Sequence, residues 1–474
     1  MKAVNTLLFI VALLAGPGHA QQPAAATTGA PGATAASEKT VAAAAVAGPR
    51  ATDAPAPRLL TLDAAALSLT AQRLRANDAT AQVAFTALKT RADKALLTPP
   101  RSVTHKSALP PSGDKHDYIS MGPYWWPNPN TPNGLPYVQR DGQRNPEVAG
   151  NAMDSIRMQQ MLADARDLAL AHHFTQDARY AQRAALVIRT WFLDPATRMN
   201  PHLKYAQGVP GIAEGRGIGL IDTRDLWWAI DAAALVHSAL SLAEHRALRA
   251  WFSEYAQWLD SSQLGRDAAA AENNHGMFYD VQMAVYWLYT GQTERARRLL
   301  FEAQTQRFAA QIAPDGSLPL ELARTRPYHY HTFTLEAMTR MARYAEVLPS
   351  LPSPPSQTSL PSLPSRPDGQ SQWTATDPRC QPPALHLNCP LDLWGRVIDG
   401  RSLRGVLDFV AAVAIEPRTW RHATRLEPQP LLAPAVPVLL MAQRAYPPRS
   451  FDAALQALKD VAPHDAARLL WPVP

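Results

Sequence analysis

The sequence is poor in the residues from which disulfide frameworks, metal centres and membrane spans are built. Its 474 residues include only two cysteines. Two cysteines cannot supply the multiple bridges of a small disulfide-stabilised domain, and no further ligands stand near them at the spacing of a zinc site. No run of lysine and arginine is dense enough to predict a nucleic-acid or lipid patch. After the first twenty residues, no apolar stretch approaches the length that spans a bilayer.

Alternating polar and apolar residues, which are typical of β-strands, are also scarce, and no short repeat is visible. Apolar residues instead recur every three or four positions, which indicates amphipathic helices joined by short connections. Consecutive helices with short loops pack as antiparallel pairs. The sequence therefore predicts an all-α fold in which helix pairs curve into an (α/α) toroid or solenoid. The main helical runs cover residues 60–96, 158–168, 180–192, 222–241, 244–260, 275–290, 293–310, 331–347, 403–414 and 429–445, with a break at His172-His173 between the second and third.

The two ends and one internal segment do not follow this helical pattern. Leu7 to Ala15 form an apolar run that is followed by small residues before a cleavage position, which indicates a signal peptide over residues 1–20. Residues 21–57 are rich in Ala, Thr and Pro and predict a flexible tether. Residues 348–372 repeat Leu-Pro-Ser triplets and predict a low-complexity insertion within one catalytic domain, residues 58–462, which a C-terminal tail, residues 463–474, follows.

A signal peptide implies that the protein is periplasmic or secreted. In that compartment Cys380 and Cys389 are expected to form a disulfide that closes a short loop. The net charge of +6 and the estimated pI of 9.3 favour an acidic partner. Export argues against nucleic acid as that partner. An anionic polysaccharide is therefore the expected partner, and the oligomeric state is left open.

The residues with the most chemical potential are Asn274 and His275, together with Arg324 and Tyr330 some fifty positions later. Cleavage of a uronate polymer by β-elimination needs a group that neutralises the carboxylate, a base for the C5 proton and an acid for the departing O4. An amide and a guanidinium can neutralise the carboxylate. The imidazole can accept a proton near neutral pH, and the phenol can donate one or, beside a cation, accept one. No metal or other cofactor is required if these four groups perform these steps.

Aromatic and polar residues elsewhere are candidates for sugar binding. The longest irregular segment, residues 98–150, contains Tyr124-Trp125-Trp126 between prolines, and such ring faces suit the apolar face of a pyranose. A polar loop offers further contacts. Arg216 is a second candidate for a substrate carboxylate, with an ion pair to Asp222 or Glu214 as the structural alternative. The loop candidates are Asn200, His202, Tyr205 and Gln207.

Each catalytic candidate also has a structural interpretation. Asn273 and Asn274 can cap the helix that starts near them, and His275 can be a buried histidine bonded to backbone. Arg324 and Arg326 can be surface charges. Tyr328 and Tyr330 can be core aromatics.

Both segments resemble the alginate lyase superfamily. The resemblance rests on the Asn274-His275 pair, on the six-residue step from Arg324 to Tyr330, and on several shorter blocks. It implies an incomplete (α/α) toroid in which Asn274 and Arg324 neutralise the carboxylate, His275 assists or acts as base, and Tyr330 is the acid or both acid and base. Arg326 and Tyr328 remain further substrate-binding candidates. The blocks include Lys115-His116-Asp117-Tyr118, Gly122 to Pro127, Asp141-Gly142, Asn145-Pro146, Asn200 to Gln207 and Gly215 to Thr223.

Two other functions compete with a polyuronate lyase that makes 4,5-unsaturated ends. A glycoside hydrolase on a similar toroid would need two carboxylates that flank the scissile bond, and Asp222, Glu272, Asp280 and Glu321 are available. A non-catalytic glycan-binding protein would keep the aromatic and basic residues alone. The sequence leaves open the identity of the uronic acid, endo- versus exo-cleavage, and whether His275 or Tyr330 is the base.

Overall fold

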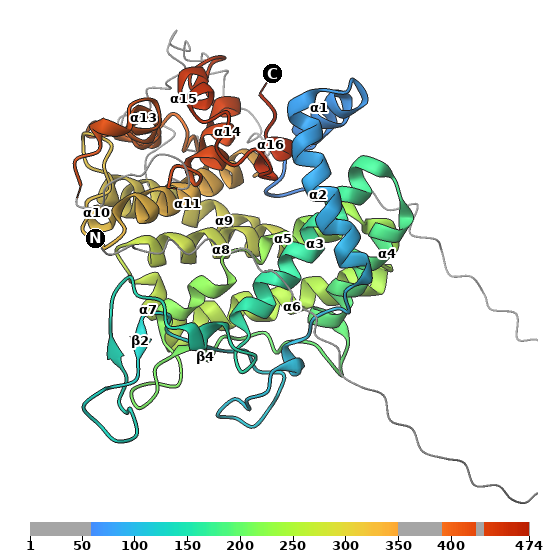
Figure 1. Ribbon diagram of the computed structural model, residues 1–474, viewed down its shortest axis with the longest axis vertical. Helices are drawn as coiled ribbons and strands as arrows, with labels where there is room; N and C mark the ends of the chain where they lie inside the picture. Colours follow the sequence, from blue (N-terminus) through green and yellow to red (C-terminus); the bar gives the residue numbers. More distant parts are fainter. Residues whose placement is uncertain (1–57, 349–390, 423–430, 474) are drawn as a thin grey trace, which may run out of the picture. The chain divides into compact units, whose positions relative to one another are not determined.

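The computed structural model describes residues 58–348, 391–422 and 431–473, and helices dominate these ranges (Figure 1). The predicted signal peptide, the tether, the Cys380–Cys389 disulfide and all but the first residue of the insertion lie outside them. The helices are α1 (Ala64–Arg75), α2 (Ala79–Leu97), α3 (Ser155–Thr175), α4 (Ala178–Ile188), α5 (Trp227–Leu235), α6 (Leu242–Ser261), α7 (Gln263–Ala269), α8 (Asn274–Thr290), α9 (Thr293–Ala303), α10 (Pro319–Leu322), α11 (Pro327–Val347), α13 (Leu403–Ile415), α14 (Ala435–Ala445), α15 (Asp452–Ala457) and α16 (Ala467–Leu470).

The predicted all-α class is confirmed, and local chemistry explains where the helices start and stop. The expected run over residues 60–96 is two helices, because Asn77 adopts a left-handed backbone with φ of 57°. Asp78 then caps α2 by accepting a hydrogen bond from the Ala81 amide at 2.9 Å. Ser241 and Glu244 form a reciprocal capping box at the start of α6.

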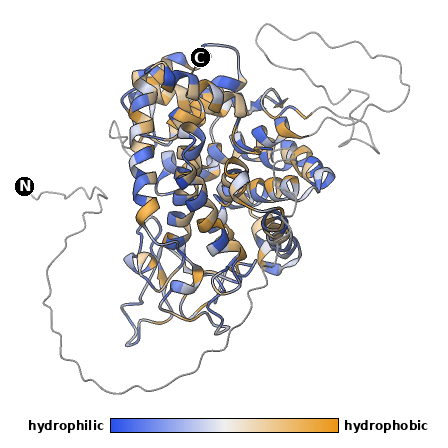
Figure 2. Ribbon diagram, turned by 90° about the vertical axis from the view of Figure 1, so that its right-hand side faces the viewer, coloured by the Kyte–Doolittle hydropathy of each residue, from blue (hydrophilic) through white to orange (hydrophobic). Residues whose placement is uncertain are grey.

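Two long helices organise the packing. α3 packs against α2, α4 and α5, and α8 packs against α6, α9 and α11. Hydrophobic and hydrophilic residues are interleaved along the helices of the fold (Figure 2). α8 is the exception, because every residue from Gly276 to Trp287 is buried. The chain thus forms an all-α toroid of paired helices, with its largest side chains in one continuous core.

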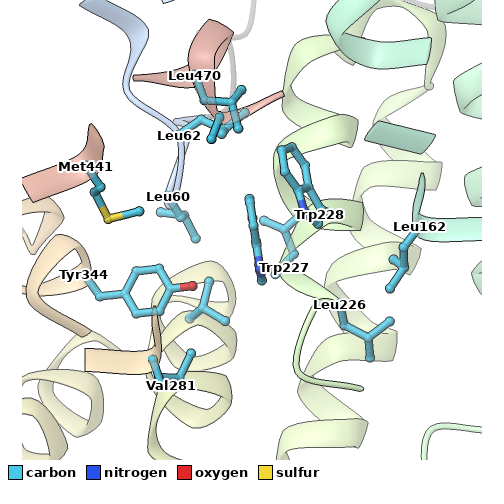
Figure 3. Packing of buried hydrophobic residues seen from close by; sticks show 14 of the residues in the cluster. Leu60, Leu62, Leu162, Leu226, Trp227, Trp228, Val281, Tyr344, Met441 and Leu470 are labelled. Carbon is cyan, nitrogen blue, oxygen red and sulfur yellow. The ribbon is translucent and has the colours of Figure 1, made fainter. Parts of the chain in front are cut away.

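The short segment before α1 is held in this core by a buried carboxylate. Asp231 of α5 is fully buried and accepts hydrogen bonds from the amides of Leu60, Thr61 and Leu62 at 2.8, 3.0 and 2.7 Å. Leu60 and Leu62 belong to the same buried cluster as Trp227 (Figure 3). Burial raises the pKa of Asp231 to about 6, although the three amides act in the opposite direction.

We expect Asp231→Ala to lower the free energy of unfolding by roughly 3–5 kcal/mol, because three buried amides would lose their acceptor. Thermal unfolding at neutral pH measures this loss. Asp177→Ala is the control, because Asp177 also accepts a backbone hydrogen bond but caps the partly exposed start of α4. Equal stability losses in the two variants would contradict the idea that Asp231 holds the segment before α1 in the core.

The irregular segment between α2 and α3 is ordered and carries three short strands. β1 (Ile119–Met121) pairs in parallel with β4 (Tyr205–Gly208), and β2 (Trp125–Trp126) pairs in antiparallel with β3 (Val138–Gln139). A third ladder joins β5 (Val397–Ile398) and β6 (Arg401–Ser402). The first two ladders hold the loop of residues 122–145, which we call the aromatic loop, near the starts of α8 and α11.

The end of the chain is also packed. The segment expected as a C-terminal tail contains α16, which contacts α1, α2 and α14, and its Trp471 is buried. None of the helices in the described ranges is long and apolar enough to cross a membrane.

Candidate active site

A cleft of about 860 Å³ lies where α8 and α11 begin. Its other walls come from the loop that carries β2 and β3, from β4, and from the 3-10 segment Gly217–Thr223. All four predicted catalytic residues line it: Asn274, His275, Arg324 and Tyr330. Residues that are some fifty positions apart therefore face one space.

The Tyr330 hydroxyl lies at the centre of a short polar chain. It is 2.8 Å from the Tyr124 hydroxyl, and Arg324 Nη2 donates to it at 3.1 Å. Burial and the hydrogen bond with Tyr124 raise the pKa of Tyr330 well above its ordinary value, although the charge of Arg324 acts in the opposite direction. The phenol is therefore protonated at neutral pH, as a general acid must be.

Arg324 is fixed from the other side by the aromatic loop. Its guanidinium lies 4.0 Å from the centre of the Tyr330 ring, and its Nη2 also donates to Asp141 at 3.0 Å. Burial alone would raise the pKa of Asp141, but the hydrogen bond and charge of Arg324 lower it below its ordinary value. Thr325 donates to the second Asp141 oxygen at 3.1 Å. Asp141 thus holds Arg324 against the ring of Tyr330.

Asn274 is the first residue of α8, and a buried glutamate fixes its side chain. Asn274 Nδ2 donates to the two Glu321 carboxylate oxygens at 2.9 and 3.1 Å, and its backbone amide donates to the same group at 2.7 Å. Asn273 is the helix cap and accepts from the His275 amide at 3.1 Å. The capping role expected for this pair therefore coexists with a place in the cleft. Burial raises the pKa of Glu321 in spite of the bonds from Asn274.

His275 is neutral at physiological pH. Burial and the positive charges of Arg324 and Arg216 lower its pKa to about 4. The Ile218 carbonyl forms a hydrogen bond with the ring, whereas the buried Nδ1 atom has no hydrogen-bond partner among the described residues. A neutral imidazole with an unused nitrogen can accept a proton.

The backbone of His275 is held by close packing. A Cβ atom on Gly276 would lie 1.9 Å from the Ala271 carbonyl oxygen. Arg307 donates to that oxygen at 3.0 Å and pairs with Asp280 at 2.7 Å. Only a residue without a side chain lets α8 approach the segment before it this closely.

Arg216 is a second guanidinium at the cleft. Among the described residues it has no carboxylate within 4.0 Å, so neither Asp222 nor Glu214 forms the ion pair that was the alternative. Its Nε donates to the Gln207 carbonyl at 2.7 Å, and it lies 5.6 Å from the centre of the Trp125 ring. Gln207 is held with φ of 47°, a strained backbone for a residue with a side chain.

Asp222 explains how Gln207 is held. Its carboxylate accepts hydrogen bonds from Ser120 at 2.5 Å, from Gln207 at 2.9 Å and from Tyr118 at 3.0 Å. The Asp222 carboxylate therefore stabilises the wall of the cleft.

The other predicted binding residues divide into two groups. Tyr124, Trp125, Gln207 and Arg216 line the cleft. The following six are not among the residues that line it: Trp126, Asn200, His202, Tyr205, Arg326 and Tyr328.

Four of these six residues have another partner or another place. Trp126 donates to the Gln143 carbonyl at 2.8 Å. Asn200 and His202 contact Asp117 at 2.7 and 2.9 Å. Tyr328 is buried and packs edge-on against Trp420.

Several cleft residues were not found from the sequence. Arg144, Arg224 and His329 all line it. Burial and nearby arginines, Arg326 first, lower the pKa of His329 to about 4. The cleft wall thus carries four arginines against two aspartates, Asp141 and Asp222, which favours an anionic ligand. Within the ranges that the structure describes, no group of three or more His, Cys, Asp or Glu residues is arranged to hold a metal ion.

Comparisons with known proteins identify the family to which the chain is similar. A family model described as alginate lyase matches residues 102–348. The solved structure of an alginate lyase from Bacteroides ovatus is 31% identical and superposes with a TM-score of 0.74, covering 88% of this chain and 99% of that one. None of the curated proteins matches.

Proposed function

Because the chain belongs to the alginate lyase family and is a polysaccharide lyase, we propose that it cleaves a polyuronate by β-elimination without a metal ion. The candidate polyuronates are polymannuronate and glucuronan. The observation that carries the proposal is the meeting of Asn274, His275, Arg324 and Tyr330 around one cleft. These four groups supply the neutraliser, base and acid that the reaction needs.

The substrate carboxylate is the first group to be bound. Arg324 and Arg216 approach it as cations, while Glu321 accepts the hydrogen bonds of the Asn274 amide and fixes that residue beside them at the cleft. Neutralising the carboxylate makes the C5 proton more acidic, because the charge that develops on deprotonation spreads onto the carboxyl oxygens. The stacked position of Arg324 on Tyr330 keeps the neutraliser next to the acid.

The pKa shifts of His275 and Tyr330 support His275 as the base and Tyr330 as the acid. The imidazole is neutral and the phenol is protonated, so the environment prepares one base and one acid. His275 takes the C5 proton, the electrons of that bond form the C4–C5 double bond, and the C4–O4 bond breaks as Tyr330 protonates O4. A bound carboxylate offsets the nearby arginines, which raises the pKa of His275 and strengthens the base.

The carboxylates near the cleft support a lyase better than a hydrolase. Asp141 is paired with Arg324, and Asp222 accepts three hydrogen bonds. Glu321 lies buried beneath Asn274, and Asp280 is paired with Arg307. None of these is set as one of two carboxylates that flank a glycosidic bond.

The test is incubation of the protein with polymannuronate, polyguluronate and glucuronan in separate reactions. A lyase generates an unsaturated end that absorbs ultraviolet light, whereas a hydrolase generates reducing ends without that absorbance. We expect absorbance with polymannuronate or glucuronan, which share their configuration at C4 and C5. Reducing ends without absorbance, or no product from any polymer with folded protein, would refute the proposal.

The pKa of His275 makes a further prediction about pH. A base must be unprotonated, so kcat/KM is expected to fall about tenfold per pH unit below roughly pH 4 and to level off above it. Arg216→Gln removes one of the cations that lower this pKa, and the acid limb should then move to higher pH. The matched control is Arg144→Gln, which also changes a cleft arginine, but one that is not a cause of the shift. The substrate carboxyl titrates identically in both variants. An unmoved limb in Arg216→Gln would argue against His275 as the base.

We also infer that the protein is exported, from the features of residues 1–20. The mature N-terminus of protein purified from its native host, determined by mass spectrometry, is expected after Ala20.

A further inference from the structure

A second basic pocket lies at the opposite end of α8 from the cleft. It has a volume of about 440 Å³, and its wall carries Arg58, His237, His245, Arg246 and Arg249. No aspartate or glutamate is among the described residues that line it. We call it the rear pocket.

The rear pocket is separate from the active site. His275 is the second residue of α8, and Tyr289, which lines the rear pocket, is its second to last. Fourteen residues of helix separate them by about 21 Å. The two cavities have no lining residue in common. A ligand in the rear pocket is therefore not a sugar of the chain segment that undergoes cleavage.

Helix termini account for only part of this charge. α5, α8 and α11 end near the rear pocket, and their terminal carbonyls attract cations. Arg246 and Arg249, however, lie in the first half of α6, far from the terminal carbonyls of their own helix, which therefore do not account for their positive charge. Among the described residues, neither arginine has a carboxylate within 4.0 Å, whereas Arg189, which also borders α6, pairs with Glu244.

The surroundings of these cations suit a sugar ring. The Arg249 guanidinium lies 5.3 Å from the centre of the Tyr289 ring, and Leu242 and Leu288 add apolar surface. Guanidinium groups bind carboxylates through paired donors, and the leucine side chains offer a surface to the apolar face of a pyranose. A neutral sugar would leave the exposed Arg246 and Arg249 bound to water alone, and a bare inorganic anion would not use the apolar wall.

We propose that the rear pocket is a second, non-catalytic binding site for an anionic oligosaccharide of the polyuronate class. The choice of polyuronate rests on the proposed function. The pocket would hold one part of a long polymer while another part, or another chain, occupies the cleft, and it would thereby raise the local concentration of substrate.

Calorimetric titration of Tyr330→Phe protein with hexamers of mannuronate and of glucuronate tests the proposal, because this background is expected not to cut the ligand. We expect two sites per chain for at least one hexamer, and one site after adding Arg246→Glu and Arg249→Glu. The matched control adds Arg75→Glu and Arg418→Glu, which make the same change in net charge at residues that line none of the cavities described. It should keep both sites.

In the active enzyme, the Arg246→Glu/Arg249→Glu pair should raise the KM for long polymer about tenfold more than the KM for the hexamer. A single site in the Tyr330→Phe background, or two sites that survive the charge reversal, would overturn the proposal. Failure of the proposed function is a different result, namely absence of ultraviolet absorbance with every polymer.

Discussion

Replacing Tyr330 by phenylalanine is expected to lower kcat by roughly 10²–10⁴-fold while the Kd for polymer changes by only a few-fold. The substitution removes the proton that O4 needs on departure, and it keeps the ring on which Arg324 stacks. Turnover is followed by ultraviolet absorbance, and binding by titration of the uncut polymer. A variant that keeps turnover would exclude Tyr330 as the acid.

Tyr328→Phe is the matched control. Tyr328 lies two residues away on the same helix and is also buried, but its hydroxyl has no hydrogen-bond partner among the described residues and it does not line the cleft. Its kcat should stay within about twofold of the original. Tyr124→Phe is the informative intermediate, because it removes the 2.8 Å contact to Tyr330 without removing the acid. We expect its loss to lie between the other two.

Replacing Arg324 by alanine is expected to lower kcat/KM by roughly 10²–10³-fold. The guanidinium would no longer stabilise the charge that develops on the carboxyl group, and Tyr330 would lose a partner at 3.1 Å. Arg324→Lys restores the charge but not the planar pair of donors, so it should recover only part of the loss. Steady-state kinetics on the best polymer measures both variants.

Arg326→Ala distinguishes the structure from the sequence. The sequence alone leaves Arg326 as a second substrate-binding candidate, but the structure places it outside the cleft wall, as an exposed residue. Its kcat/KM should change by less than about threefold. A loss as large as that of Arg324→Ala would mean that this structure assigns the wrong arginine.

The helical part of the fold could be predicted because it follows from local patterns. The start of α8 is visible in the sequence as two asparagines before an apolar run, and Asn273 is the observed cap. The split between α1 and α2 was missed because a single left-handed residue, Asn77, interrupts a continuous apolar pattern. Short strands such as β2 are set by pairing across the loop, which a periodicity of two residues cannot reveal.

The active site was predictable only in part, for a different physical reason. Residues that do the chemistry need rare combinations of groups, and Asn274, His275, Arg324 and Tyr330 stand out on that ground. Residues that hold them do not. Glu321 lies in an ordinary Leu-Glu-Leu context, and only its burial beneath Asn274 reveals that it is a partner.

The polar loop around residues 200–207 shows that composition can also suggest binding residues that have partners within the protein. Asn200 and His202 have the composition of a sugar-binding surface, but they bind Asp117 instead. Composition cannot distinguish a side chain that waits for a ligand from one that is already satisfied within the protein.

Gly276 restricts how this enzyme can be remodelled. Any side chain at that position would displace the Ala271 carbonyl and Arg307, which is bound to it. The imidazole of the preceding residue, His275, would then shift with the helix. A saturation library at residue 276 should therefore return glycine alone. Altered sugar preference must be sought at other wall residues of the cleft, such as Gln139 and Arg144 on the loop that carries β2 and β3.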